Sequence, residues 1–514
     1  MKTFISLMSK KMNKQISFTP SSFRHLHSSL LHNILILHSN PFYLELIYFF
    51  SLSSIGFLAL KSTNPRTPNT KPNDINLFFT SVSASTVSSM STVEMEIFTN
   101  TQLVFLTILM FLGGEVFTSM LRLHLKGANK ERTLLVSSDS YENFNTHIEL
   151  GTFRVHEKAP DVKLKKSIKI LAYLVTCYIL VTHIIGSALV AGYLRAVPGA
   201  KKVLETKGIK MLTFSVFTTV STFSNCGFVP TNENMVVFRS NPGLMLILIP
   251  QILMGNTLYP VFLRLSIWVM TKMTRRLEFS YVLENNREVG YGHLLPRLDT
   301  LCLGMTALGF IVVQMVLFCA LEWSAESVGG GLSVYEKAVA ILFQVVNSRH
   351  AGESVFDLSA VSPAILVMFV VMMYLPPYTS YLPIKQAENG ATNTEQKKKT
   401  NKGFWENILF SQLSYIFIFV FLICITERHK MKTDPLNFNL LSIVVEVVSA
   451  YGNVGLSVGY SCERRINLDG DCKDAWYGFV GKWSDEGKCL LIIVMFFGKL
   501  KKFNKRGGKA WRLA

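Results

Sequence analysis

A Ser/Thr-rich stretch that recurs four times in the chain constrains the fold more than any other feature. Its first copy, residues 78–100, is too polar to cross a bilayer, and it lies between two long apolar runs. Three later stretches align to it without gaps when four residues are superposed: Ser89, Gly227, Gly352 and Gly455. All four copies carry Val seven positions earlier, and three of them have Ser directly after that Val. A span, a short helix with an irregular turn and a second span form a re-entrant pore loop, so we expect four such repeats.

The composition supports a membrane protein, because only 17% of the residues are charged and 49% are hydrophobic. We expect an all-α polytopic fold with eight transmembrane helices and four re-entrant pore helices around one central pore. The eight spans are expected at residues 42–60, 102–121, 168–194, 244–270, 300–323, 364–384, 404–425 and about 488–499. The net charge of +18 could suggest nucleic acid, but the basic residues fall between spans and no nucleic-acid motif is present.

Basic connections between the spans predict the orientation. By the positive-inside rule both termini are expected in the cytosol, although the lysines of 195–210 dissent on the outer side. The basic N-terminal segment resembles a transit peptide in its Ser content but is poor in Arg, which favours a cytosolic tail. The expected organisation is tail (1–41), repeat A (42–121), cytosolic loop (122–166), repeat B (167–270), cytosolic loop (271–297), repeat C (298–384), Lys-rich cytosolic loop (385–403), repeat D (404–503) and cytosolic tail (504–514).

The four aligned residues suit a cation filter. A ring of backbone carbonyls can replace the water shell of an ion, and Gly reaches the required dihedrals freely, whereas Ser reaches them only with strain. The neighbours expected to support the four turns are Thr86, Val87, Ser88, Asn225, Cys226, His350, Ala351, Asn453 and Val454. Two alternatives stay open: Gly455 and Gly459 have a helix-packing spacing, and Gly227 could cap a helix.

Four motifs together carry a resemblance to a known family: TVSSMSTVEME, FSNCGFVPTNENM, VVNSRHAGES and SAYGNVGLSVGYSC. They resemble the pore loops of the plant HKT transporters, within the Trk/Ktr/HKT superfamily, and the resemblance runs from about residue 42 to the C-terminus. In that family each repeat supplies one filter residue, and Ser in the first position resembles the Na+-selective class I subgroup. The resemblance implies Na+ held transiently at the filter, a plasma-membrane homodimer with lipid around it, and a role in plant sodium homeostasis. A Na+/K+ symporter or a mixed K+/Na+ uniporter is the alternative.

Several further residues near the turns are candidates for a functional role. Acids follow the filter positions and are expected to attract cations at the outer mouth, although exposed acids need no function: Glu233, Glu353 and Asp357, with Glu94 and Glu96. Pro376 and Pro377 break the sixth span, as a gate hinge or a passive kink. Lys488 and Lys499 lie in the last apolar run and either face the pore or snorkel to an interface.

The remaining motifs exclude more than they assign. Cys462 and Cys472 share a predicted outer loop, where a disulfide can form. The sequence contains no CxxC, HExxH, Walker-type or catalytic-triad pattern, and no convergent His, Asp or Cys that a membrane enzyme would need. We therefore expect neither enzymatic activity nor a cofactor.

Overall fold

The computed structural model describes residues 41–66, 72–142, 159–325, 328, 330–380, 412–465, 472 and 474–501. The predicted tails 1–41 (except residue 41) and 504–514 and the Lys-rich loop 385–403 lie outside the described residues. The chain divides into two units, Met1–Tyr48 and Phe49–Ala514. The first unit is described only over residues 41–48, at the start of one helix.

The described residues form helices joined by turns, with no strand among them, as the all-α prediction requires. Repeat A contains α3 (Pro41–Ser62), α4 (Asp74–Thr86), η2 (Met95–Ile97), α5 (Asn100–Gly113) and α6 (Glu115–Glu142). Repeat B contains α7 (Ala159–Ala196), α8 (Pro198–Thr206), α9 (Met211–Ser224), η3 (Val236–Phe238), α10 (Pro242–Gly255) and α11 (Tyr259–Thr274), followed by α12 (Leu277–Glu284) and α13 (Asn286–Val289). Repeat C contains α14 (Arg297–Glu322), α16 (Val334–His350), η4 (Leu358–Ala360) and α17 (Pro363–Tyr374). Repeat D contains α19 (Gln412–Thr426), α20 (Arg428–Thr433), α21 (Leu440–Gly452), η5 (Cys462–Arg464), η6 (Phe479–Lys482) and α22 (Asp485–Leu500).

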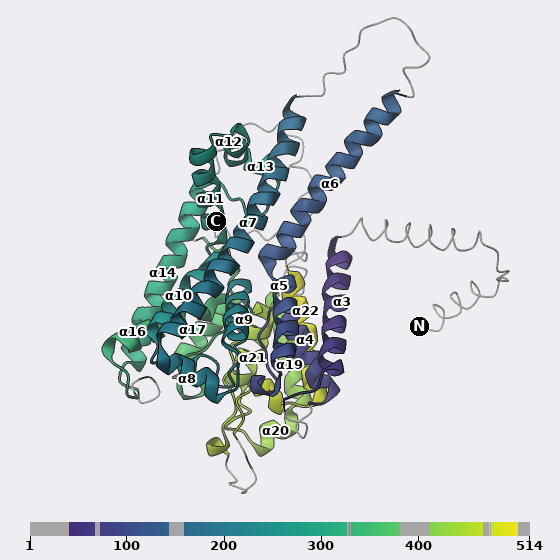
Figure 1. Cartoon of the computed structure of the whole chain (residues 1–514). Coiled ribbons are helices and arrows are strands. Elements are labelled where there is room, and N and C mark those ends of the chain that lie inside the picture. Colours follow the sequence, from purple (N-terminus) through teal and green to yellow (C-terminus); the bar gives the residue numbers. More distant parts are fainter. Residues whose placement is uncertain are drawn as a thin grey trace, which may run out of the picture. The chain divides into compact units, whose positions relative to one another are not determined.

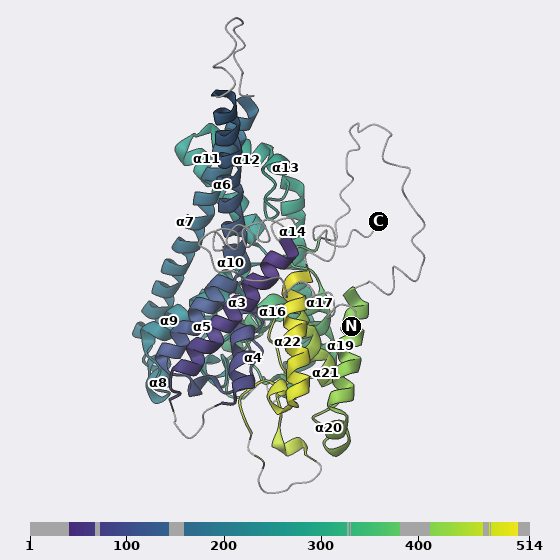
Figure 2. The ribbon, with the colours of Figure 1, turned by 90° about the vertical axis from the view of Figure 1, so that its right-hand side faces the viewer.

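The four short helices α4, α9, α16 and α21 are the pore helices of the predicted repeats. Each packs against the second span of the preceding repeat: α9 on α5, α16 on α10, and α21 on α17. The first pore helix, α4, packs on α22, the last span of the chain. Figure 2 shows α22 beside α21 and α4. The four repeats therefore close into a circle, which is the arrangement a single central pore needs.

The Ser and Thr residues of the pore helices lie inside the protein, where each hydroxyl needs a partner. In α4 the residues from Phe79 to Thr86 are all buried. Several of these hydroxyls donate back to a carbonyl in the preceding turn, as Thr86 Oγ1 does to Val82 O at 2.7 Å. This local bonding explains how a Ser/Thr-rich sequence can remain helical in an apolar surrounding.

Three described helices are long and apolar enough to cross a membrane: Phe42–Ser62, Lys163–Ala196 and Arg297–Glu322. Two further pairs qualify together but are bent, by 55° between α5 and α6 and by 86° between α10 and α11. The second and fourth predicted spans are therefore broken rather than straight. The described parts of the last three predicted spans form shorter helices, of which α17 and α19 are apolar.

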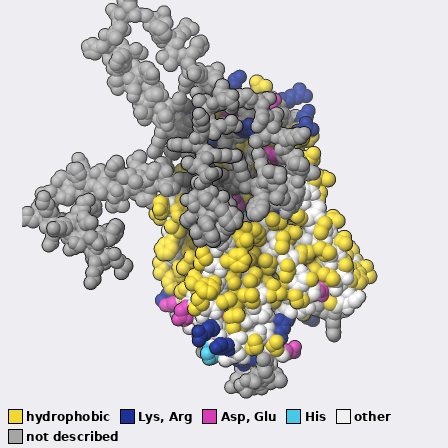
Figure 3. Space-filling model, turned by 180° about the vertical axis from the view of Figure 1, so that it is seen from behind, with side chains coloured by type: hydrophobic (Ala, Val, Ile, Leu, Met, Phe, Trp, Pro, Cys, Tyr) yellow, Lys and Arg dark blue, Asp and Glu magenta, His cyan; other side chains and the backbone are white. Residues whose placement is uncertain are grey.

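Hydrophobic side chains cover the middle of the face seen in Figure 3, and charged side chains gather toward its two ends. The long helix α14 exposes large apolar residues at helical spacing along one side: Leu301, Met305, Leu308, Val312 and Val316. An apolar belt of this kind matches a hydrocarbon environment better than water. Away from the pore helices, α6 and α7 run side by side (Figure 1).

Candidate functional site

The structure brings the four aligned residues Ser89, Gly227, Gly352 and Gly455 next to one another; we call them the ring residues. A Cβ atom built on Gly227 would lie 1.8 Å from Ala351 O, and one on Gly352 would lie 1.9 Å from Val454 O. A Cβ atom on Gly455 would lie 2.2 Å from the Cβ atom of Ser89. We call the turns of repeats A to D copies A to D. The ring residue of copy B thus lies against copy C, that of copy C against copy D, and that of copy D against copy A.

The circle closes between copies A and B. The buried Cys226, one residue before Gly227, lies close to the backbone of Ser89. Residues more than a hundred positions apart in the sequence therefore meet in one ring, with backbone against backbone.

All four ring residues have positive φ, from 53° at Ser89 to 96° at Gly455. In three copies the residue two positions earlier is also left-handed and ends the pore helix: Val87, Asn225 and Asn453. Gly adopts such a backbone without a steric penalty, but Ser and Val do so only when the surrounding structure holds them. The aligned sequence positions therefore share a backbone conformation as well as a place in the ring.

In copies B and D a pore-helix serine holds the ring residue from behind. The amide of Gly227 donates to Ser221 Oγ at 3.1 Å, and the amide of Gly455 donates to Ser449 Oγ at 3.0 Å. Both serines are buried and lie six positions before the glycine that they hold. In these two copies the aligned serine therefore holds the turn through its hydroxyl.

Copy A differs, although it has the same serine. The buried Ser83 hydroxyl has no hydrogen-bond partner among the described residues. Instead the hydroxyl of Ser88 lies 2.8 Å from Thr86 Oγ1, and the side-chain amide of Asn453 donates to Ser88 Oγ at 2.7 Å. The Ser89 side chain is only 6% exposed and lies against Gly455. Copy A is therefore supported by a side chain of copy D in addition to bonds with its own pore helix.

Copy C runs one residue longer than the others. The helix α16 continues to His350, and Ala351 keeps a right-handed backbone. Val346 stands where the other copies have serine, and the next residue, Asn347, accepts through Oδ1 from the amide of Glu353 at 3.1 Å. The hydrogen-bonding frame has shifted by one position, which a gap-free alignment cannot show.

This shift corrects one prediction. Glu353 was expected at the outer mouth with the other acids, but its side chain is fully buried. Its Oε1 accepts from Thr222 Oγ1 at 2.6 Å, so the carboxyl joins copy C to copy B directly behind the ring. No sequence pattern connects these two residues, which lie 131 positions apart.

Glycines in the second spans were missed by the sequence reasoning. A Cβ atom on Gly113, Gly255 or Gly498 would lie within 2.2 Å of a carbonyl oxygen near the end of a pore helix, that of Ser85, Phe223 and Tyr451 respectively. Each of these carbonyls belongs to the residue four positions before a ring residue. The signal was available as a Gly following an apolar run in three repeats.

Comparison with known proteins identifies the family to which this chain belongs. The family model for TrkH, described as a cation transport protein, matches residues 145–504. The chain is 53% identical to the "Sodium transporter HKT1" of Arabidopsis thaliana, over 88% of this chain and 92% of that protein. It is 46% identical to the rice "Cation transporter HKT1;3" over 100% of this chain and 98% of that protein. The chain belongs to the HKT transporters of the TrkH family. These relatives are named as transporters and not as enzymes, in agreement with the sequence reasoning.

A solved structure agrees with this membership at the level of fold. The potassium transporter TrkH from Vibrio parahaemolyticus matches 90% of this chain and 83% of its own, with a TM-score of 0.51 and 14% sequence identity. The HKT fold with four pore-loop repeats is therefore the fold of this chain, as the sequence predicted.

Two of the residues predicted to support the HKT pore loops form hydrogen bonds with the second spans. The side-chain amide of Asn225 donates to Ile252 O at 3.4 Å, and that of Asn453 donates to Met495 O at 3.1 Å. Val87 and Val454 are buried beside them. In copy C the guanidinium of Arg349 donates instead to the carbonyls of Pro376 and Pro377, at 3.0 and 3.1 Å.

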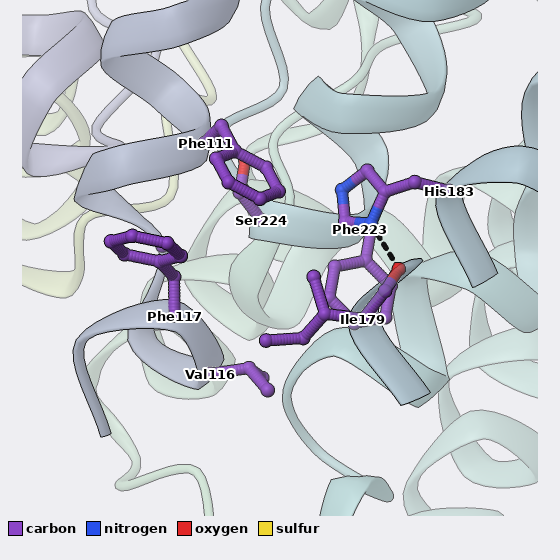
Figure 4. Close-up of a pocket in the computed structure, with 8 residues that line it drawn as sticks. Phe111, Val116, Phe117, Ile179, His183, Phe223 and Ser224 are labelled. Atoms are coloured by element: carbon purple, nitrogen blue, oxygen red, sulfur yellow. Dashed lines mark hydrogen bonds between the residues drawn. The ribbon is translucent and has the colours of Figure 1, made fainter. Parts of the chain in front are cut away.

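The second spans of the HKT fold break at different residues. The helix α17 ends at Tyr374, directly before Leu375, Pro376 and Pro377, where the sequence predicted a break. The span of repeat A bends at Gly114, beside a small apolar pocket of about 10 Å³ lined by residues of α5, α6, α7 and α9 (Figure 4). In that pocket His183 Nδ1 lies 2.7 Å from Ile179 O. A role of these breaks in gating stays a prediction.

The outer acids are paired or capping rather than open. Asp357 is exposed and accepts from the amide of Ser359 at 2.9 Å. Glu233 forms an ion pair with Lys207 at 2.5 Å, and Glu96 forms a second one with the same ammonium at 2.5 Å. Burial lowers the pKa of Lys207, but the hydrogen bonds to Glu233 and Glu96 outweigh it, so the pKa is raised above its usual value.

The lysines of the last span have distinct surroundings. Lys488 is buried near the N-terminal end of α22, with Nζ 3.5 Å from Asp485 Oδ1. Lys499 lies over the Phe49 ring at 5.3 Å. Lys501, which the sequence reasoning passed over, donates to Tyr451 O at the end of α21 at 3.3 Å. Between α21 and α22, Cys462 and Cys472 form a disulfide.

Proposed function

We propose that this chain passes Na+ selectively and passively across the plasma membrane through the ring formed by Ser89, Gly227, Gly352 and Gly455. The observation that carries the proposal is the closed ring of four turns with positive φ, in which one residue alone bears a side chain. Carbonyl oxygens in such a ring can replace part of the hydration shell of a cation.

The Ser89 side chain supplies the discrimination. Ser89 is nearly buried, and its side chain lies where a Cβ atom on Gly455 would point, so in this proposal it acts by distorting one quadrant rather than by blocking the lumen. A ring with one displaced quadrant offers an incomplete cage to K+, which needs most of its water replaced at once. The smaller Na+ passes while keeping part of its own water.

The proposal also covers the orientation of the chain in the membrane, its cargo and its oligomeric state. The basic connections between spans favour cytosolic termini by the positive-inside rule. The 53% identity to a named sodium transporter of Arabidopsis thaliana supports Na+ as the cargo and plant sodium homeostasis as the role. We further propose a homodimer with one pore per protomer, in contact with membrane lipid.

The test is the reversal potential of the expressed chain in a voltage-clamped cell. External Na+ and K+ are replaced in turn by an impermeant cation at constant ionic strength. A Na+ uniporter shifts its reversal potential by roughly 60 mV per tenfold change in Na+ and ignores K+, because tenfold is worth about 1.4 kcal/mol and 100 mV about 2.3 kcal/mol per charge. A shift with both ions contradicts the proposal and favours the mixed uniporter, and a Na+ flux that requires K+ favours the symporter.

A further inference from the structure

One lysine joins the outer segments of two pore loops. Lys207 follows α8 and contacts Glu96 Oε1 and Glu233 Oε2, both at 2.5 Å. Glu96 lies seven positions after the ring residue of copy A, and Glu233 lies six positions after that of copy B. The two carboxylates are therefore close neighbours above the ring, with a single ammonium between them.

The same segments are also joined by hydrogen bonds to side-chain oxygens. The amide of Glu96 donates to Asn232 Oδ1 at 2.9 Å, and the amide of Asn232 donates to Glu96 Oε1 at 3.0 Å. Glu94 accepts from the side chain of Asn232 at 3.2 Å and from the amide of Trp476, in copy D, at 3.2 Å. A change in the charge balance at Lys207 thus reaches three of the four pore loops.

The triad is set into the protein rather than spread over its surface. The side chains of Lys207, Glu96 and Glu233 are 16%, 23% and 24% exposed. A pair of charges at this depth interacts more strongly than an exposed pair and is less screened by salt. Carboxylate and amide oxygens brought together in this way are also the ligands that Ca²⁺ prefers.

We propose that Lys207 is a specificity-determining residue of the outer mouth: its ammonium occupies the place between Glu96 and Glu233, offsets one of their two negative charges, and so keeps external divalent cations from binding there. The proposal rests on the proposed function only in that the ring conducts a monovalent cation, whether Na+ or K+. It goes beyond that function because it assigns the tolerance of external Ca²⁺ to one named side chain.

The experiment compares Lys207→Met, Lys207→Arg and Lys201→Met. Lys201 is the matched control, because it lies on α8 and loses the same charge, but its ion pair with Glu205 is exposed and touches neither pore loop. Current is recorded at constant ionic strength while external Ca²⁺ is raised through the millimolar range. We expect Lys207→Met to be inhibited at about tenfold lower Ca²⁺ than the wild type, since divalent affinity follows the charge of the ligand set. Lys207→Arg and Lys201→Met should match the wild type.

Equal Ca²⁺ sensitivity in Lys207→Met and Lys201→Met would overturn the proposal. If Lys207→Met gives no current, the thermal unfolding temperature of the purified variant is measured with and without Ca²⁺. A rise in Lys207→Met that the wild type lacks supports the proposal, and no rise overturns it. Because both readouts follow Ca²⁺ at the outer mouth, they are independent of whether the ring prefers Na+ to K+.

Discussion

Copies A and B of the pore loop share a backbone conformation but differ in what holds it. In copy B a glycine occupies the ring, and the hydroxyl of Ser221 accepts its amide hydrogen bond. In copy A a serine occupies the ring, and the equivalent Ser83 hydroxyl has no hydrogen-bond partner within the described structure. Copy A relies instead on Asn453, which reaches across from copy D to Ser88.

This difference shows how one side chain can be admitted to a ring built for glycine. A non-glycine residue with positive φ costs about 1–3 kcal/mol unless its surroundings hold it in place. Ser89 is held by packing against Gly455 and through its neighbour Ser88, so the strain is shared with copy D. The ring is therefore asymmetric, because its one side chain, on Ser89 of copy A, lies against copy D.

The largest expected effect comes from adding a methyl group to a glycine quadrant. In Gly352→Ala the new Cβ would lie 1.9 Å from Val454 O, and the residue keeps a φ of 76°. We expect the ring to lose its geometry and the current to fall to background, as measured by voltage clamp with surface expression monitored. Gly459→Ala is the control, because Gly459 has a similar φ of 68° but open space around its Cβ position. Current lost equally in both variants would show that φ, and not the ring contact, is what matters.

A smaller loss is expected at the carboxyl that joins copies B and C. Glu353→Ala leaves the buried Thr222 hydroxyl without its acceptor, which costs about 1–3 kcal/mol for a buried polar group. We expect a lower unfolding temperature and a smaller current, whereas Glu353→Gln keeps an acceptor oxygen and should lie close to the wild type. Asp357→Asn, at an exposed acid, keeps an acceptor oxygen for the amide of Ser359 and should leave both quantities unchanged. An unfolding temperature as high in Glu353→Ala as in Asp357→Asn would contradict the proposed bridge.

The smallest expected effect comes from removing the aligned serine hydroxyl, in copy D and in copy A. Ser449→Ala removes the hydroxyl that accepts from the amide of Gly455, and one such bond is worth about 0.5–1.5 kcal/mol. We expect a modest drop in unfolding temperature and a change in the Na+ conductance. Ser83→Ala, at the equivalent position in copy A, removes a hydroxyl without a described partner and should be nearly silent. Equal effects in the two variants would contradict the asymmetry.

Much of the ring could be predicted from the sequence because a repeat carries its own internal standard. The alignment of Val and Ser columns was enough to bring Ser89, Gly227, Gly352 and Gly455 into register, and the structure places these four side by side. The helix break before Pro376 followed from the missing amide of proline.

Other features could not be read from one sequence. The bend at Gly114 lies inside an unbroken apolar run, so hydropathy alone indicates a straight span. The one-residue extension of copy C depends on Asn347 competing for the role of a serine, and it moves Glu353 from an expected exposed loop into the interior. The contact of Lys207 with two acids joins loops of different copies, and sequence separation does not encode such contacts.

The role of the Ser89 side chain is tested by the Na+/K+ permeability ratio of Ser89→Gly and Ser89→Ala beside the wild type. The ratio is taken from reversal potentials with Na+ or K+ as the sole external permeant cation. We predict that Ser89→Gly, which removes the Cβ atom lying against Gly455, gains K+ permeability, whereas Ser89→Ala keeps that atom and stays selective for Na+. An unchanged ratio in Ser89→Gly, or an equal gain of K+ permeability in both variants, would contradict this prediction.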